Sequence, residues 1–407
     1  MIVSLLVAAI LVLSGPAAAI AHVPAAESRL ADLLRERLHD PRLGHDVAFI
    51  VTDAVSGAVL GTHAPDRPMR AASNMKLVTA TTALATMGPD KRFPTRVLAG
   101  SGPSDIVIQG GGDPLLSRHD VELLATRTVE HIEPGSRVTV HVDGDLFPKP
   151  SSADGWVDEY LGHAVGMTQS LAIHGDRSAR PSRNAAAVFT TRLRALGIKA
   201  TLAGNQDAVP DAAVISSFRG HSVSDAVATM LRESDSSIAE VLFRQVAISS
   251  GRPATWRGSR RAAMESLRAL GLDVRHVVLK DGSGLSREDR LTPRFLAAVL
   301  TLIRVDERPR FAAIFRLDAL PTAGRSGTLG RTYGRFSSRP SKCAVGDIRA
   351  KTGTIRGTIA LSGLARTVFG GRRIFSIIVN DRPQRYSALA TRQAVDGLAA
   401  TIAGCWR

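Results

Sequence analysis

The stretch Ala350-Lys351-Thr352-Gly353-Thr354 opens a run of three strand-like segments near the end of the 407-residue chain. Glycine-containing turns separate the segments, which predicts an antiparallel meander over residues 348–354, 358–366 and 372–379. A small glycine on an edge strand lets an extended ligand pair alongside it. Lys351 and Thr352 would then offer a positive charge and a hydroxyl to a carboxylate, and a plain solvent-facing strand end is the alternative.

The other end of the chain supplies elements that fit the same sheet. Residues 27–38 place four leucines on one face of a predicted helix, and residues 47–52 and 58–62 are strand-like runs joined by a turn. A last helix is predicted over residues 387–402. Both chain ends therefore look like parts of one sheet flanked by helices, which is an α/β (α+β) fold.

The middle of the chain differs from its ends. Residues 93–217 show short apolar runs broken by Gly, Pro and Asp, which predicts an inserted, mostly β subdomain. We therefore assign residues 22–92 plus 218–407 to one domain and residues 93–217 to the insertion. The length of the chain agrees with two such units.

A second motif, Ser73-Asn74-Met75-Lys76, stands at the start of a helical pattern that Gly88-Pro89 ends. The spacing places Lys76 one turn after Ser73 on the same helix face. A serine hydroxyl is a weak nucleophile until a base accepts its proton, and a neutral lysine can do so. The helix N-terminus also favours the negative charge that develops there. Because a serine can simply cap a helix, this motif alone decides little.

A third motif, Ser234-Asp235-Ser236, comes directly before Ser237-Ile238-Ala239-Glu240. The latter tetrad has the pattern of a capping box, which predicts a helix that begins near Ile238. Ser234 and Ser236 would then lie in a constrained loop at a helix start, where their hydroxyls can point into a cleft. Plain capping chemistry explains this segment equally well when it is taken by itself.

The composition excludes several classes of protein. The 52 Lys and Arg residues against 37 Asp and Glu give a net charge of +15, but they are spread along the chain without a basic run, and aromatic residues make up only 4%. We therefore expect a basic surface or attraction to an anionic cell envelope, and no nucleic-acid partner. The histidines lack metal-ligand spacing and the glycines at 110–112 lack a phosphate-loop sequence, so no metal or cofactor is implied.

The first 21 residues have the pattern of a secretory signal peptide. An uncharged apolar run is followed by Ser14-Gly15-Pro16 and by a small-residue cleavage site that ends at Ala21. The usual positive charge before the apolar run is missing, and a retained anchor is the alternative. Export would make a disulfide between Cys343 and Cys405 possible, but the spacing does not distinguish it from two free thiols.

Along the chain the motifs follow the order Ser73-x-x-Lys76, Ser234-Asp235-Ser236 and Lys351-Thr352-Gly353, which is the set found in serine β-lactamases and penicillin-binding proteins. The chain resembles the D-alanyl-D-alanine carboxypeptidase/endopeptidase family, which comprises the low-molecular-mass class C penicillin-binding proteins, or serine DD-peptidases. Family-like stretches extend well beyond the motifs. They include Gly111-Gly112-Asp113-Pro114, Ala239-Glu240, Asp281-Gly282-Ser283-Gly284-Leu285-Ser286-Arg287, Leu320-Pro321 and Gly327-Thr328-Leu329. The 281–287 segment itself reads as a structural connector before a helix capped by Thr292.

The resemblance implies a β-lactamase/transpeptidase-like fold and a peptidase that cleaves the D-Ala-D-Ala bonds of peptidoglycan stem peptides through an acyl-enzyme. Cross-link cleavage and acylation by β-lactams are also implied. In this family's pattern Ser73 is the nucleophile, Lys76 its base and Ser234 the proton donor to the leaving amine. The same pattern assigns substrate binding to Ser236, Lys351, Thr352 and Gly353, and the oxyanion hole to the backbone N–H groups of Ser73 and Thr354. The positive charge of Lys351 and partial burial are expected to keep Lys76 neutral.

Two features depart from the family. The third residue of the Ser234 motif is usually Asn, and Ser236 is shorter and less able to bind two partners at once. The spacing between Ser73 and Ser234 is short for this branch, so we expect a reduced insertion. The alternatives to a DD-peptidase are a β-lactamase or esterase, which lacks support because no Glu-x-x-Leu-Asn follows the Ser234 motif, and a cell-wall-binding relic disabled by Ser236.

Overall fold

The structure is a computed structural model that describes residues 25–305, 309–316 and 318–406. The predicted signal peptide lies outside the described residues. Among the helices that are described, none combines the length and apolar character that crossing a bilayer requires.

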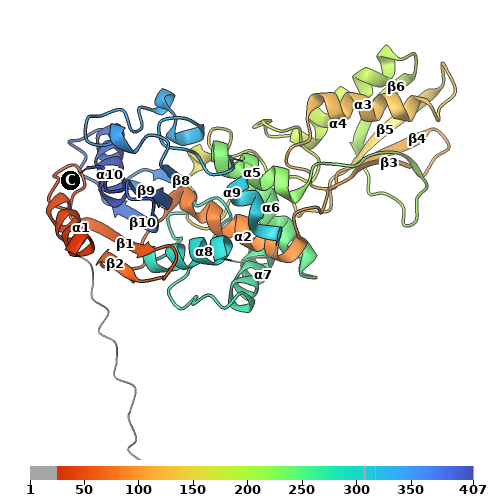
Figure 1. Cartoon of the computed structure of the whole chain (residues 1–407). Helices are drawn as coiled ribbons and strands as arrows, with labels where there is room; N and C mark the ends of the chain where they lie inside the picture. The colour runs from red at the N-terminus through yellow and green to blue at the C-terminus, as the bar shows by residue number, and fades with distance from the viewer. Residues whose placement is uncertain (1–24, 306–308, 317, 407) are drawn as a thin grey trace, which may run out of the picture.

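Both ends of the chain build one antiparallel sheet, as predicted (Figure 1). Its strands run in the order β2-β1-β10-β9-β8, and each pair of neighbours is antiparallel. The strands are β1 (Asp46–Asp53), β2 (Val59–His63), β8 (Ile348–Ile355), β9 (Thr358–Arg366) and β10 (Arg372–Asn380). The predicted meander is therefore confirmed, and β8 is an edge strand of the sheet.

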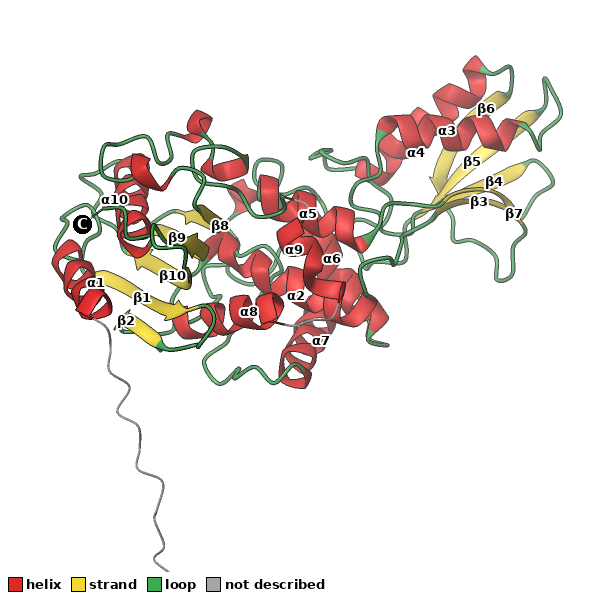
Figure 2. Cartoon of the chain, viewed as in Figure 1, coloured by secondary structure: helices red, strands yellow, loops and turns green. Residues whose placement is uncertain are grey.

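Helices cover both faces of this sheet because its strands bury apolar side chains on both sides (Figure 2). One face packs against α1 (Ala25–Arg37) and α10 (Ala388–Ile402), which places one hydrophobic core there. The other face packs against a larger helical group that contains a second core. Its helices are α2 (Met75–Met87), α5 (Val223–Glu233), α6 (Ser236–Ser249), α7 (Trp256–Ala269), α8 (Pro293–Val305) and α9 (Ala312–Arg316).

A second sheet lies in the middle of the chain and projects from the helical side of the first unit (Figure 1). Its strand order is β6-β5-β4-β3-β7, with β4, β5 and β6 parallel and the remaining pairs antiparallel. These strands are β3 (Thr95–Ala99), β4 (Asp105–Gln109), β5 (Arg137–Asp143), β6 (Lys199–Asn205) and β7 (Val214–Phe218).

Two helices that we did not predict from the sequence pack against this second sheet. Together with the sheet they enclose a third hydrophobic core. They are α3 (Arg118–Val129) and α4 (Pro181–Ala195). The α/β class is confirmed, whereas the expectation of a mostly β middle is incomplete. Parallel strands need long crossover connections, and α3 and α4 provide the two that join β4 to β5 and β5 to β6.

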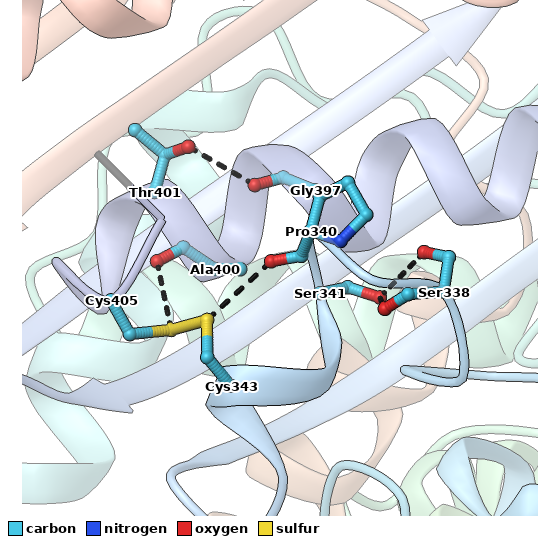
Figure 3. Close-up of a disulfide and its surroundings, with 8 residues drawn as sticks. All are labelled: Ser338, Pro340, Ser341, Cys343, Gly397, Ala400, Thr401 and Cys405. Atoms are coloured by element: carbon cyan, nitrogen blue, oxygen red, sulfur yellow. Dashed lines mark hydrogen bonds between the residues drawn. A yellow bond between two sulfur atoms is a disulfide. The ribbon is translucent and has the colours of Figure 1, made fainter.

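Cys343 and Cys405 form a disulfide, with their Cα atoms 5.9 Å apart (Figure 3). The bond joins the short 3₁₀ turn Lys342–Ala344 to the segment that follows α10. Of the two alternatives that the spacing left open, the structure therefore shows the bonded one. A structural disulfide agrees with an oxidising environment outside the cytoplasm.

Candidate active site

Three elements distant in sequence bring the predicted site residues together. They are the N-terminal end of α2, the turn between α5 and α6, and the edge strand β8. The 3₁₀ turn η1 (Ala72–Asn74) leads into α2 and carries Ser73. Gly353 on β8 allows the strand to approach this turn, because a Cβ at that position would lie 2.6 Å from the carbonyl oxygen of Ala71. Gly353 of the first motif is therefore required by the close approach of β8 to Ala71 and Ala72, which directly precede Ser73.

Lys76 lies one turn after Ser73, as its spacing predicts, and its Nζ is 3.0 Å from Ser73 Oγ. The side chain is fully buried. Nζ is also 3.3 Å from Ser236 Oγ, and it donates to the carbonyl oxygen of Ser283 at 2.8 Å. The amine therefore touches the hydroxyl of Ser73 and is held from two other sides.

Burial lowers the pKa of Lys76 to about 8, against the opposing effect of the negative charges of Asp281, Glu240 and Asp235. From the sequence we expected only partial burial of Lys76 and attributed part of the lowering of its pKa to a positive Lys351. Burial is instead the dominant cause of the lowered pKa of Lys76. The pKa of Lys351 is itself strongly lowered, which disfavours the positive charge that this explanation requires. At neutral pH a usable fraction of Lys76 is the free amine, which is the form that can accept a proton.

Ser234 faces the other lysine of the site. It ends α5 in a left-handed backbone conformation (φ 61°), and Lys351 Nζ donates to its Oγ at 2.8 Å. Lys351 is fully buried on β8, and burial, followed by the positive charges of Lys76 and Arg335, holds its pKa well below the usual range. The hydroxyl of its neighbour Thr352 is 2.7 Å from that of Thr328. Each of the two site lysines thus has its own serine from the α5–α6 turn.

The predicted capping box at residues 237–240 is wrong. Helix α6 begins at Ser236, and its N-cap is Asp235, whose carboxylate accepts the N–H of Ile238. Burial raises the pKa of Asp235, but the contact with His174 and the Ile238 N–H outweigh it and lower that pKa overall. An aspartate at the earlier position competes successfully for the cap, which leaves Glu240 free to turn into the protein interior.

The connector that follows Lys280 forms one wall around Lys76, although the sequence suggested only a structural role. Asp281 accepts the N–H groups of Gly284 and Ser286 and the indole N–H of Trp156. Gly284 has a φ of +79°, and a Cβ there would lie 1.9 Å from the Ala72 carbonyl oxygen. The signal that could have found this wall is the Asp-Gly-Ser-Gly run itself, since paired glycines mark close approach of two backbones.

The sequence matches the D-Ala-D-Ala carboxypeptidase 3 (S13) family over residues 30–166 and 168–402. Carboxypeptidase DacB of Mycolicibacterium smegmatis is 31% identical over 398 residues, which cover 92% of this chain and 84% of the relative. Penicillin binding protein 4 (dacB) from Haemophilus influenzae has a similar solved structure, with a TM-score of 0.73, 20% identity, and coverage of 89% of this chain and 97% of that one.

The same Haemophilus influenzae protein has also been solved in complex with a β-lactam, and that structure matches with a TM-score of 0.67 and 20% identity over 91% of this chain and 99% of that one. The resemblance inferred from the three motifs is thus confirmed by the family match and by the fold. The chain belongs to the D-Ala-D-Ala carboxypeptidase 3 (S13) family of serine peptidases.

Proposed function

We propose that Ser73 is the nucleophile of this peptidase and that Lys76 is its general base. The observation that carries the proposal is the 3.0 Å contact between Lys76 Nζ and Ser73 Oγ, made by a buried amine whose pKa is about 8. Both the geometry and the protonation state suit proton abstraction near neutral pH.

The substrate we propose is a peptidoglycan stem peptide that ends in D-Ala-D-Ala. Ser73 Oγ attacks the carbonyl carbon between the two D-alanines while its proton moves to Lys76 Nζ. The backbone N–H groups of Ser73 and Thr354 stabilise the oxyanion, as in the family pattern. The tetrahedral intermediate then expels D-alanine as the amine, which receives its proton through Ser234. Water then attacks the resulting ester and gives a proton to the free amine of Lys76, the bond between the acyl carbon and Ser73 Oγ breaks, Oγ takes the proton back from Lys76, and the acyl group leaves as a carboxylate.

The edge strand β8 binds the substrate in this proposal. The 321–323 segment pairs with residues 348–350 of β8, and in this proposal an extended peptide pairs with the strand farther along, near Gly353, while Lys351 with Thr352 holds the terminal carboxylate. Lys351 Nζ also contacts Ser234 at 2.8 Å, which connects the carboxylate-binding group to the proton donor. The same steps acting on a cross-linked peptide would give endopeptidase activity.

We extend β-lactam binding to this chain from the Haemophilus influenzae relative, which has been solved with such a ligand. A β-lactam would acylate Ser73 as a substrate mimic. A cell-wall substrate also places the enzyme outside the cytoplasm, and the proposed route is the signal peptide at residues 1–21.

The test is covalent labelling of the purified protein with a fluorescent penicillin, together with release of free D-alanine from a synthetic peptide that ends in D-Ala-D-Ala. We expect Ser73→Ala to lose both signals. Ser249→Ala, which alters an exposed serine at the end of α6, is the matched control and should retain them. A wild-type protein that takes up no label would favour the cell-wall-binding alternative over the enzyme.

A further inference from the structure

Three buried carboxyl groups interact with one another, two of them with Lys76 as well, and the proposed chemistry uses none of them. Glu240 and Asp281 are fully buried, and Asp289 is 2% exposed. They come from α6 and from the loop that precedes α8. A buried carboxylate is costly unless hydrogen bonds satisfy it, so the partners of each one indicate what it is for.

Glu240 uses both oxygens to hold one short stretch of backbone. Its Oε2 accepts the N–H of Gly282 at 3.0 Å, and its Oε1 accepts the N–H of Ser283 at 2.9 Å. The hydroxyl of Thr79, on α2, donates to the carbonyl oxygen of Gly282 at 2.6 Å. The Gly282–Ser283 peptide is therefore fixed from α6 on one side and from α2 on the other.

The next carbonyl of this stretch determines how Lys76 is oriented. The Ser283 carbonyl oxygen accepts an N–H of Lys76 at 2.8 Å. A carbonyl can only accept, whereas the hydroxyls of Ser73 and Ser236 can donate or accept. The Ser283 carbonyl oxygen therefore accepts one N–H of Lys76 whether the amine is charged or neutral. In the neutral amine this orientation leaves the lone pair free to face Ser73 Oγ.

We propose that Glu240 is a positioning residue for Lys76, acting through the Ser283 carbonyl and through its own negative charge. The inference rests on the proposed role of Lys76 as general base. Glu240 does not touch the reacting atoms. It fixes the backbone that aims the amine, and its charge offsets part of the effect of burial on Lys76.

The charged residues around Lys76 and Glu240 determine in which direction the loss of the Glu240 carboxylate would move the pKa of Lys76. The negative charges of Asp281, Glu240 and Asp235 raise the pKa of Lys76 against burial, and Lys351 is a positive neighbour whose own pKa is lowered by burial and by the charge of Lys76. Burial and the charge of Asp281 raise the pKa of Glu240 to about 8, against the N–H groups of Ser283 and Gly282 and the positive charge of Arg244. Wherever Glu240 is ionised, its negative charge raises the pKa of Lys76, so replacing the carboxylate with a neutral group would lower that pKa and the free amine would form at lower pH.

The experiment measures the second-order rate constant for penicillin acylation of Ser73 between pH 6 and 9.5. In the wild type the rate should rise with pH and level off above a midpoint of about 8, because only the free amine accepts the proton. Glu240→Gln keeps the size of the side chain but removes its charge and one acceptor. We expect its plateau to fall roughly 10–100-fold, and its midpoint to move to lower pH by about 0.5–1 unit.

Two further variants separate positioning from charge. Thr79→Val removes the hydroxyl that fixes the same peptide from α2, so its plateau should fall while its midpoint stays at the wild-type pH. Glu265→Gln makes the same chemical change at an exposed residue of α7 and should match the wild type in both quantities. If Glu240→Gln does not fold, Thr79→Val still tests the positioning step.

The proposal is overturned by a Glu240→Gln protein with a wild-type plateau, by one whose plateau falls without any shift of the midpoint, or by Thr79→Val with a wild-type plateau. Failure of the proposed function would look different. In that case the wild type would take up no penicillin, or Ser73→Ala would still be labelled.

Discussion

Two lysines fully buried in one site are unusual, because burial disfavours the ammonium form of each and their charges repel each other. Three carboxyl groups surround Lys76 and oppose this effect, whereas Lys351 has Lys76 and Arg335 as its charged neighbours. The pKa of Lys351 is accordingly the more strongly lowered of the two. A substrate carboxylate placed beside Lys351 would raise that pKa, so binding of the substrate should be coupled to proton uptake at this residue.

The motif that the chain resembles has Asn at the position of Ser236, and Ser236 Oγ is 3.3 Å from Nζ of Lys76, the proposed general base. We expect Ser236→Ala to slow acylation of Ser73 by roughly 5–10-fold, since a hydrogen bond of this kind contributes about 1 kcal/mol. Ser236→Asn restores an amide and should acylate at least as fast as the wild type. Stopped-flow measurement of penicillin acylation checks the order Asn, Ser, Ala.

Ser249→Ala again serves as the control for loss of a hydroxyl from α6. Equal rates for Ser236→Ala and the wild type would show that the contact contributes nothing to acylation. They would also remove the reason for treating Ser236 as a weakened form of the family motif.

At the scale of single elements, the sequence predicts correctly those strands and helices whose residue pattern is compatible with only one type of secondary structure. The meander of β8, β9 and β10 and the helix after Ser73 fall into this class. The start of α6 does not, because Asp235 and Ser237 both fit a cap and only the tertiary structure shows that Glu240 is recruited by the Gly282–Ser283 backbone. The contact of Lys76 with Ser283 joins residues 207 positions apart, a distance over which motif spacing is uninformative.

The disulfide ties the end of the chain to a turn beside the sheet, on the same side as α1 and α10. It closes a loop between residues 62 positions apart. We expect Cys343→Ser with Cys405→Ser to lower the free energy of unfolding by about 2–5 kcal/mol, mainly through a less restricted unfolded chain. Denaturant unfolding of the double variant and the wild type measures this difference.

Penicillin labelling of the double variant at 25 °C should remain close to the wild type, because Ser73 and Lys76 lie with the helical group on the opposite face of the sheet. A double variant of wild-type stability would instead show that the native contacts around α10 already restrict this end of the chain. Reducing agent added to the wild type should reproduce the effect of the double variant.

At the scale of the whole molecule, the middle of the chain is connected to the site through one side chain and one backbone N–H group. Trp156 donates its indole N–H to Asp281 at 2.6 Å, and the N–H of Gly166 bonds the hydroxyl of Ser237 on α6 at 2.9 Å. Its residues thus support the wall around Lys76, while its second sheet extends away from the first unit (Figure 1). The extent of the insertion, residues 93–217, stays a prediction. A sequence shows that its hydrophobic pattern changes in this region more clearly than it shows the residue at which each domain boundary lies.

The net charge of +15 also acts at this scale, because the basic residues are spread along the whole sequence instead of in one basic run. Peptidoglycan carries carboxylates, so a basic enzyme should accumulate on it through long-range attraction. We expect the inactive Ser73→Ala protein to co-sediment with purified peptidoglycan at low salt and to be released as salt rises, since the Debye length shrinks from roughly 10 Å at 0.1 M to 3 Å at 1 M. The bound fraction measured at increasing NaCl checks this. Binding that does not change with salt would assign wall retention to specific contacts, and the charge would then have no part in localising the enzyme.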